Sequence, residues 1–230
     1  MIDSGFEDEW TLGRLLRERF SVRAFTSQPV PLEVVREIAS LAQLTPSWCN
    51  SQPWSVTIVT GRALTRLASV LVEDVLSGKT DHPDIPFPTD YEGEYLDRRR
   101  ESGHLLYEAV GIDREDVVGR FSQMLENFRF FGAPCLAIVH SPESLGDYGA
   151  IDCGGYISNF MLAARSKGVA SVAQAALASR PKVLHEELDI AVDRRIVCGI
   201  SFGYADYSHP INNFRTGRAS VDDTVTWLQD

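Results

Sequence analysis

Two arginines and a serine lie close together where a helical pattern gives way to an extended segment, at Arg19, Ser21 and Arg23. Planar guanidinium groups match the oxygens of a phosphate, and the serine hydroxyl adds a further donor. With the adjoining Phe20, these residues form a candidate anion site. The alternative is a solvated basic patch at a helix C-terminus, where the helix dipole stabilises cations in any case. Taken alone, the segment favours that alternative.

A second pair of arginines, Arg215 and Arg218, lies in the C-terminal tail within residues 212–218, a segment with no regular periodicity. Anion binding is one explanation for it, and solvation at the surface is the other. The chain has 22 basic and 32 acidic residues and a net charge of −10. This balance argues against nucleic acids and anionic membranes as partners, because both require an excess of basic residues. Any bound anion must therefore be held by a local arginine cluster.

Residues 46–54 form a stiff connection that is rich in proline, amide and tryptophan side chains. An amide side chain offers both a donor and an acceptor, so such a loop can recognise the polar edge of a planar heterocycle. The alternative is an ordinary helix-to-strand connection with a buried tryptophan. The density of unusual residues favours a binding role for Pro46, Ser47, Trp48 and Asn50.

Two further segments are compatible with a flat ligand. The aromatic side chains of residues 127–134, which begin at Asn127, form either the core, as aromatic residues usually do, or the wall of a binding site. Residues 168–176 are rich in glycine and alanine, so their backbone can approach a ring closely. Gln174, Ala175 and Ala176 are the candidates there, and a tightly packed strand and turn explains the same residues equally well.

The order of periodic segments indicates an α+β (mixed α/β) fold in a single domain of 230 residues. Apolar residues make up 44% and charged residues 23% of the chain, which is ordinary for a globular protein. Helices are expected at residues 11–20, 31–44, 62–76, 95–110, 114–128, 148–167 and 182–188. Strands are expected at residues 54–60, 135–140, 168–178 (a short strand and a turn) and 195–202.

Three regions complete the expected organisation. Residues 78–89 are rich in proline and acidic side chains and are expected to form a mobile loop, so residues 78–128 are a candidate lid. The tail from residue 204 onward is expected to be irregular as far as residue 225. Residues 1–10 do not resemble a signal peptide, and the four cysteines have no CxxC spacing, so a reduced cytoplasmic protein is expected.

Taken in order, these motifs resemble the nitroreductase family of FMN enzymes. The family pattern R-x-S-x-R-x-F matches from Arg19 to Phe25, P-S-x-x-N-x-Q-P-W matches from Pro46 to Trp54, and N-x-x-F-F-x-A-P matches from Asn127 to Pro134. The arginine-bearing tail completes the match, which extends over nearly the whole chain. Residues 98–116 further resemble the branch of nitrobenzoate-type reductases.

The resemblance implies a nitroreductase-like fold, in which helices flank a mainly antiparallel central sheet, and an intertwined homodimer with FMN at the subunit interface. Arg19, Ser21 and Arg218 would hold the phosphate and ribityl chain, and Arg23 would lie near the N1/C2 edge of the flavin. Ser47 and Asn50 would come from the partner subunit. The backbone around residues 174–176 would lie against flavin N5.

The implied reaction is ping-pong oxidoreduction. NADH or NADPH gives a hydride to flavin N5, and a nitroaromatic or quinone-type acceptor then takes two electrons in the same pocket. No catalytic acid–base side chain is required. The chain departs from many relatives at residues 172–174, where a Cys-Pro or Pro-x-Glu is common, and this departure concerns the side-chain contacts at N5. Trp48 and Cys49 also replace smaller residues, which indicates a narrower pocket.

Two other functions remain open at this level. Residues 199–203 match G-x-S-x-G, the nucleophile elbow of serine hydrolases, with Ser201 as nucleophile. The residues that follow are not helical, and only His209 follows the serine, so the match is interpreted as chance. A non-catalytic flavin-binding protein on the same scaffold is the third possibility. The scattered histidines show no metal-ligand spacing, and no metal is expected.

Overall fold

A computed structural model describes residues 11–229, so the expectation about residues 1–10 falls outside the described part. The described residues contain eight α-helices and four strands, joined by loops and short 3₁₀ turns. In chain order these are α1 (Leu12–Glu18), α2 (Leu32–Ala42), β1 (Ser55–Thr60), α3 (Gly61–Leu76), α4 (Gly93–Ala109), α5 (Val117–Leu125), β2 (Cys135–Pro142), α6 (Gly146–Ser166), β3 (Ala170–Gln174), α7 (Pro181–Leu188), β4 (Arg194–Gly203) and α8 (Val221–Thr224).

The four strands form one antiparallel sheet in the order β1-β2-β4-β3. The two longest strands, β2 and β4, occupy its centre, while β1 and β3 lie at its edges. The predicted α+β architecture with a mainly antiparallel sheet is therefore confirmed.

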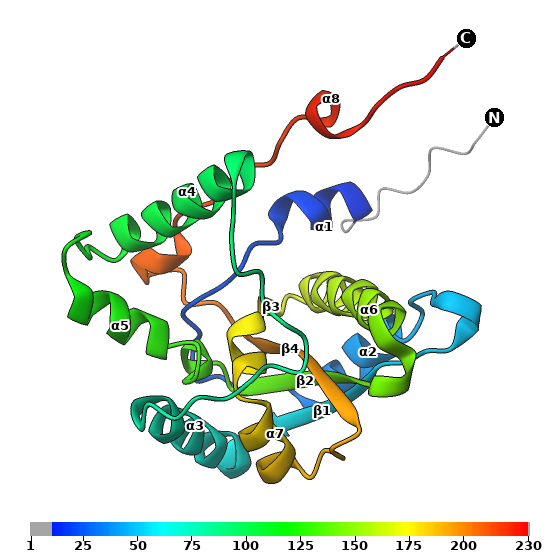
Figure 1. Ribbon diagram of the computed structural model, residues 1–230, viewed down its shortest axis with the longest axis horizontal. Coiled ribbons are helices and arrows are strands. Elements are labelled where there is room, and N and C mark those ends of the chain that lie inside the picture. Colours follow the sequence, from blue (N-terminus) through cyan, green and yellow to red (C-terminus); the bar gives the residue numbers. More distant parts are fainter. Residues whose placement is uncertain (1–10, 230) are drawn as a thin grey trace.

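Helices cover both faces of the sheet, with α2 and α6 on one side and α3 and α7 on the other (Figure 1). Side chains of β2 alternate between these faces, as the two-residue period of a strand requires. Cys135, Ala137 and Val139 pack towards α2 and α6, whereas Leu136 and Ile138 pack towards α3 and α7. Because both faces are covered, β2 is apolar at every position of this run.

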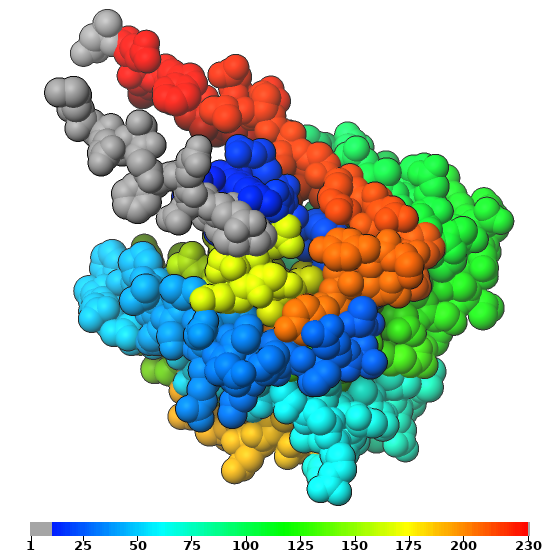
Figure 2. Space-filling view, turned by 180° about the vertical axis from the view of Figure 1, so that it is seen from behind, coloured from blue at the N-terminus to red at the C-terminus, as the bar shows by residue number. Residues whose placement is uncertain are grey.

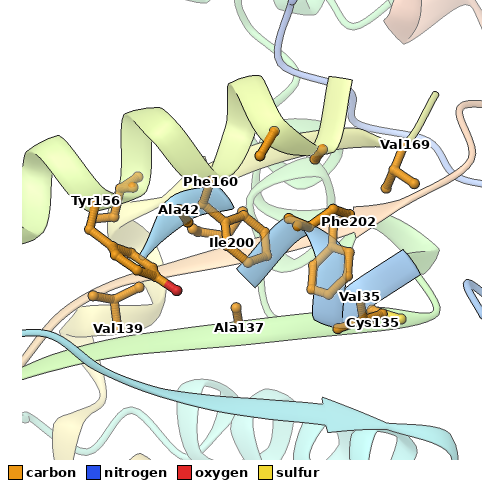
Figure 3. Close-up of a cluster of buried hydrophobic side chains, with 14 of the residues drawn as sticks. Val35, Ala42, Cys135, Ala137, Val139, Tyr156, Phe160, Val169, Ile200 and Phe202 are labelled. Carbon is orange, nitrogen blue, oxygen red and sulfur yellow. The ribbon is translucent and has the colours of Figure 1, made fainter. Parts of the chain in front are cut away.

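Aromatic side chains fill the layer between the sheet and α6 (Figure 3). The rings of Phe160 and Phe202 meet edge to face with centroids 5.3 Å apart, and Trp54 stacks on Tyr156 at 5.1 Å. Complete burial of a phenylalanine side chain contributes about 2–3 kcal/mol. These contacts fix α6 on the sheet and hold the start of β1 beside it.

The small residues of α6 allow close packing within the chain. A Cβ atom on Gly149 would lie 2.7 Å from the Ser141 hydroxyl, and one on Gly155 would lie 3.3 Å from the Thr45 methyl group. Gly154 has open space around it. At least part of this small-residue pattern therefore positions α6 against its own sheet and loop.

Residues 77–92 contain no helix or strand, as expected, but they are tied to the body of the protein. The Asp84 carboxylate accepts a hydrogen bond of 2.7 Å from the Ile196 backbone N–H and lies 3.5 Å from His185 Nε2. Arg195 Nε also donates to the Asp84 carbonyl. Beyond this anchor, α4 and α5 stand away from the sheet (Figure 1).

The tail departs from the expectation at one place. Its short helix, α8, spans Val221–Thr224, and residues 225–229 are irregular. Ser220 and Asp223 form a capping box, in which each side chain accepts a hydrogen bond from the other's backbone N–H. Within residues 11–229, no helix has the length and apolar character needed to cross a membrane.

Candidate functional site

The fold brings together two of the predicted phosphate-binding arginines, although 199 positions separate them in the sequence. Arg19 caps the C-terminus of α1, and Arg218 lies in the tail. Burial lowers the pKa of the Arg19 guanidinium, and the positive charge of Arg218 lowers it further. Two cations held this close repel one another, so a bound anion would stabilise both.

Aromatic rings hold the other two arginines in place. The guanidinium carbon of Arg215 lies 3.4 Å from the centroid of Phe20, and that of Arg23 lies 5.6 Å from the centroid of Phe214. Burial lowers the pKa of Arg23 as well. Both contacts join the tail to the segment after α1.

Asn212 ties these two segments together through its side chain. Its Oδ1 accepts a hydrogen bond of 2.8 Å from the Arg23 backbone N–H, and its Nδ2 donates to the carbonyls of Ala24 and Asp206. Neither Asn212 nor Phe214 was predicted individually, although both lie in the tail segment singled out from the sequence. The arginines of that segment made it a candidate site. Nothing in the sequence spacing predicted that Asn212 would join the tail to the segment of Arg23.

The four arginines form what we call the cation cluster: Arg19, Arg23, Arg215 and Arg218. In the described part of the chain none of them forms an ion pair with an acidic side chain. The tail that carries two of them crosses beside α1 and α4 (Figure 2). Arg19 and Arg23 are partly buried, whereas Arg215 and Arg218 are exposed. A cluster of cations without acidic partners among the described residues fits the phosphate group expected of a nucleotide cofactor.

The cation cluster adjoins the edge strand β3. The Val22 backbone N–H donates to the Ser171 carbonyl at 3.3 Å, so the segment from Ser21 runs beside the start of this strand. Backbone groups two residues apart in a strand point the same way. The N–H of Ala173 therefore also faces the outer edge, away from β4. Ala173 and Ala175 are exposed and small, which leaves a surface that a flat ring can approach.

Gln174 lies between these two alanines but points inward. Its side chain is only 3% exposed, and its Nε2 donates to the Asn127 carbonyl at 2.9 Å. This side chain is therefore engaged inside the protein, and the expected contact of the backbone around residues 174–176 with a flavin ring stays a prediction. Ala173 was not among the candidates chosen from the sequence, because its outward backbone follows only from the position of β3 at the sheet edge.

The segment from Asn127 to Phe131 is strained and largely buried. Phe130 and Phe131 have φ angles of 59° and 54°, values that residues with a Cβ atom rarely adopt. Both rings are buried, as is that of Phe128, so these aromatics belong to the core and do not wall a site. Strained backbone of this kind persists only where surrounding contacts hold it.

The predicted loop of residues 46–54 lies apart from the cation cluster. It is the light-blue segment on the far side of α6 from α4 in Figure 1. The Trp48 backbone N–H donates to Asp152 on α6 at 3.0 Å, and the Trp48 ring lies 5.3 Å from that of Tyr148. Trp48 is nevertheless 64% exposed. Within the described residues, no hydrogen bond or ring contact joins this loop to the cation cluster.

The same loop holds three non-glycine residues at positive φ. Cys49, Asn50 and Gln52 have φ angles of 50°, 56° and 47°. The Ser47 hydroxyl accepts from the Gln52 backbone N–H, and the Gln52 side chain donates to Asn50 Oδ1. Each such residue costs about 1–3 kcal/mol and tends to occur where function requires the shape. Pro46, Ser47, Trp48 and Asn50 thus lie in a loop that is separate from the cation cluster, and their binding role stays a prediction.

The G-x-S-x-G match is part of the sheet. Ser201 is fully buried within β4 and donates a hydrogen bond from Oγ to Gln174 Oε1. A Cβ atom would clash with Leu177 at Gly199 and with Pro134 at Gly203, so close packing explains both glycines. The serine hydrolase alternative is wrong, because a nucleophile elbow requires an exposed serine on a turn. Among residues 11–229 no group of three histidine, cysteine or acidic side chains is placed to hold a metal.

Comparisons with known proteins agree with this geometry. Residues 16–204 match the model of the nitroreductase family. The chain is 38% identical to a 4-nitrobenzoate reductase of Nocardioides sp. (strain LMS-CY), over 94% of this chain and 89% of that protein. It is 36% identical to nitroreductase NfnB of Mycolicibacterium smegmatis (strain ATCC 700084 / mc(2)155), over 92% of this chain and 90% of the relative.

Solved structures give the same result. The FMN-dependent nitroreductase NfnB from Mycobacterium smegmatis in complex with NADPH superposes with a TM-score of 0.91 and 35% identity, covering 94% of this chain and 97% of that chain. The FMN- and NADPH-dependent NfnB from Sphigopyxis sp. strain HMH gives a TM-score of 0.92 at 30% identity, covering 96% and 100%.

The fold and the site define a flavoprotein oxidoreductase of the α+β type. The chain belongs to the nitroreductase family. The predicted family, its nitrobenzoate-reductase-like branch and the enzyme class, an NAD(P)H-dependent flavin oxidoreductase, are confirmed.

Proposed function

We propose that this chain is an FMN-dependent nitroreductase that oxidises NADPH and reduces flat nitroaromatic acceptors. The observation that carries the proposal is the cation cluster, four arginines without acidic partners among the described residues, beside the exposed edge of β3. FMN and NADPH are named for two similar structures, and nitrobenzoate for a similar enzyme. Quinones, which are also flat two-electron acceptors, are the alternative acceptor class.

The places of these residues in the fold support the following proposed roles. Arg19 and Arg218, with the Ser21 hydroxyl, bind the phosphate and ribityl chain of FMN. Arg23 would stabilise negative charge on the flavin ring by charge that is already in position. The outward backbone N–H of Ala173 would donate to the ring edge, with the turn at residues 174–176 beside it. The chemistry that bound FMN would supply is two-electron transfer from the nicotinamide to the acceptor.

The proposed active form is a homodimer in which each site takes residues from both subunits. The loop at Ser47 and Asn50 is exposed and strained, yet it lies apart from the cation cluster of its own chain. Apolar side chains near it are also exposed, including Leu44 and Ile151. A partner subunit that covers this face would bury them and bring its own loop to the cation cluster.

Mixed dimers test the shared site directly. Arg19→Ala and Asn50→Ala chains are co-expressed with different affinity tags, and the doubly tagged dimer is isolated. If Arg19 and Asn50 of one site come from different chains, the mixed dimer has one intact site and one doubly altered site. FMN content near half of the wild-type value supports the shared site. Content no higher than in either parent dimer contradicts it.

Turnover separates the enzyme from a non-catalytic flavin-binding protein. The purified protein is expected to show flavin absorption bands that bleach on addition of NADPH without oxygen and return when a nitroarene is added. A protein that remains colourless after incubation with FMN contradicts the proposed function. A protein that binds FMN but does not consume NADPH with any acceptor is a flavin-binding protein.

Two further features are proposed for the cellular enzyme. Residues beyond the Asp84 anchor, α4 and α5 above all, act as a lid that selects acceptors, and the exposed side chains of Val117, Val118 and Phe121 are available to contact them. A Phe121→Ala variant is expected to change the ranking of acceptors and leave FMN content intact.

The location is proposed to be the cytoplasm, consistent with four cysteines that form no disulfide.

A further inference from the structure

A buried chain of hydrogen bonds joins β4, the edge strand β3 and the segment after α5. Ser201 on β4 donates to Gln174 Oε1, and Gln174 Nε2 donates to the Asn127 carbonyl at 2.9 Å. The donor on one side and the acceptor on the other fix the orientation of the Gln174 amide. A single side chain therefore links the centre of the sheet to the strained segment that follows α5.

This chain of contacts reaches three segments that border the proposed flavin site. Gln174 ends β3, whose outward backbone adjoins the site. Asn127 begins the strained turn that contains Phe130 and Phe131. The Phe131 carbonyl in turn accepts a hydrogen bond of 3.3 Å from the Phe25 backbone N–H, two residues after Arg23. No other side chain in the described part is bonded to both β4 and Asn127.

We propose that Ser201 and Gln174 are positioning residues of the flavin site. Neither side chain touches the ligand. Together they hold the strained turn against β3, and through it the segment that carries Arg23. This inference rests on the proposed function only in naming the ligand as FMN, because the contacts themselves belong to the protein alone.

Packing explains why this position requires a serine. Residues 199, 201 and 203 of β4 point to the same face of the sheet, and that face has no room for a Cβ atom at Gly199 or Gly203. Serine is the smallest side chain that carries a hydroxyl. Removing that hydroxyl leaves the Gln174 Oε1 atom buried without a hydrogen-bond donor, which is unfavourable. The amide can find another donor only by rotating, and rotation breaks its hydrogen bond to Asn127.

Ser201→Ala is therefore expected to loosen the turn and leave the fold intact. In the protein without FMN, hydrogen exchange of the backbone amides of residues 127–133 should become about five- to tenfold faster, the effect of losing one buried hydrogen bond. In the loaded enzyme the flavin midpoint potential should shift, and kcat should fall by a similar factor with little change in the KM for NADPH.

Ser141→Ala is the matched control. Ser141 is also a buried serine of the same sheet, but it lies near the other end of β2, where it pairs with Arg195. It should change neither exchange at residues 127–133 nor the potential. A double-mutant cycle of Ser201→Ala with Gln174→Met should be strongly non-additive, since both changes break one network.

The outcomes are distinguishable. If Ser201→Ala and Ser141→Ala lower the Tm alike and leave the exchange of residues 127–133 and the potential at wild-type values, Ser201 has no positioning role. Additive effects in the cycle would also overturn the inference. A wild-type protein that binds no FMN removes the proposed function, whereas the exchange measurement still tests the network.

Discussion

The guanidinium of Arg215 stacks on the ring of Phe20, with 3.4 Å between its central carbon and the ring centroid. This contact joins the C-terminal tail to the segment after α1 across most of the sequence. A cation over an aromatic face contributes about 0.5–2 kcal/mol, depending on how far it is removed from water. An uncharged aromatic residue, Phe20, therefore helps to hold the tail and its arginines at the cation cluster.

Phe20→Leu should weaken FMN binding without removing any charge. The loss of the ring face is expected to cost about 0.5–2 kcal/mol of binding free energy, since Arg215 and the tail become less ordered. The dissociation constant of FMN for the apoprotein, measured by quenching of flavin fluorescence, checks this. Tyr107→Leu is the control, because it removes a similar contact to Arg120, at 5.2 Å, outside the cation cluster. Equal losses in both variants would contradict the assigned role of Phe20.

Arg19→Ala and Arg218→Ala should each weaken FMN binding, by about 1–3 kcal/mol for one charge-assisted hydrogen bond. The same changes should slightly stabilise the protein without FMN, because each removes one member of a repelling pair of cations. Thermal unfolding of the two forms checks these opposite signs. Arg66→Ala removes a surface arginine that pairs with Glu187 and should affect neither quantity. Destabilisation of both forms would indicate a purely structural role for the pair.

Asp152→Ala should release the strained loop after α2. The carboxylate accepts a hydrogen bond from the Trp48 backbone N–H, next to Cys49 and Asn50, which both have positive φ. Loss of this bond should raise the dissociation constant of FMN several-fold, because Asn50 is no longer presented in one conformation. Asp222→Ala, at an exposed acidic residue of α8, serves as the control. Unchanged FMN affinity in Asp152→Ala would contradict the role proposed for this loop.

The sequence predicts most of the elements because their signals are local. The burial of β2 on both faces follows from a continuous apolar run, and Pro31 and Gly61 lie at the boundaries where helices begin. The boundaries of α5 and α8 differ from expectation because capping decides them. Asp116 caps α5 later than its apolar pattern suggested, and Ser220 begins α8 before residue 225.

The candidate site is only partly predictable, since its contacts join distant segments. The sequence motifs predict the arginines of the cation cluster. The hydrogen bond between the Arg23 backbone and Asn212, however, depends on the path of the tail. The inward direction of Gln174 depends on which strand lies beside β3. The alternation of side chains along β3 allows Gln174 to face either side of the sheet. Its hydrogen bond with Ser201 establishes which side it faces.

Stability should fall in weak acid because of His140. Burial, with the nearby charge of Arg194, lowers the pKa of its imidazole from 6.5 to about 4. The unfolded chain binds a proton below pH 6.5, whereas the folded chain does so only near pH 4. The free energy of unfolding therefore decreases as the pH falls through this window, by about 3 kcal/mol at most.

Denaturant unfolding at pH 7 and pH 4.5 measures this contribution. His140→Gln keeps an acceptor for the Arg194 guanidinium, which donates to His140 Nδ1 in the wild type, and cannot take up a proton. The variant should therefore lose less stability between the two pH values than the wild type does. His104→Gln, at an exposed helical position, should retain the wild-type dependence. If His140→Gln retains it too, His140 takes up its proton as readily in the folded as in the unfolded chain, and the acid sensitivity arises from the carboxylates.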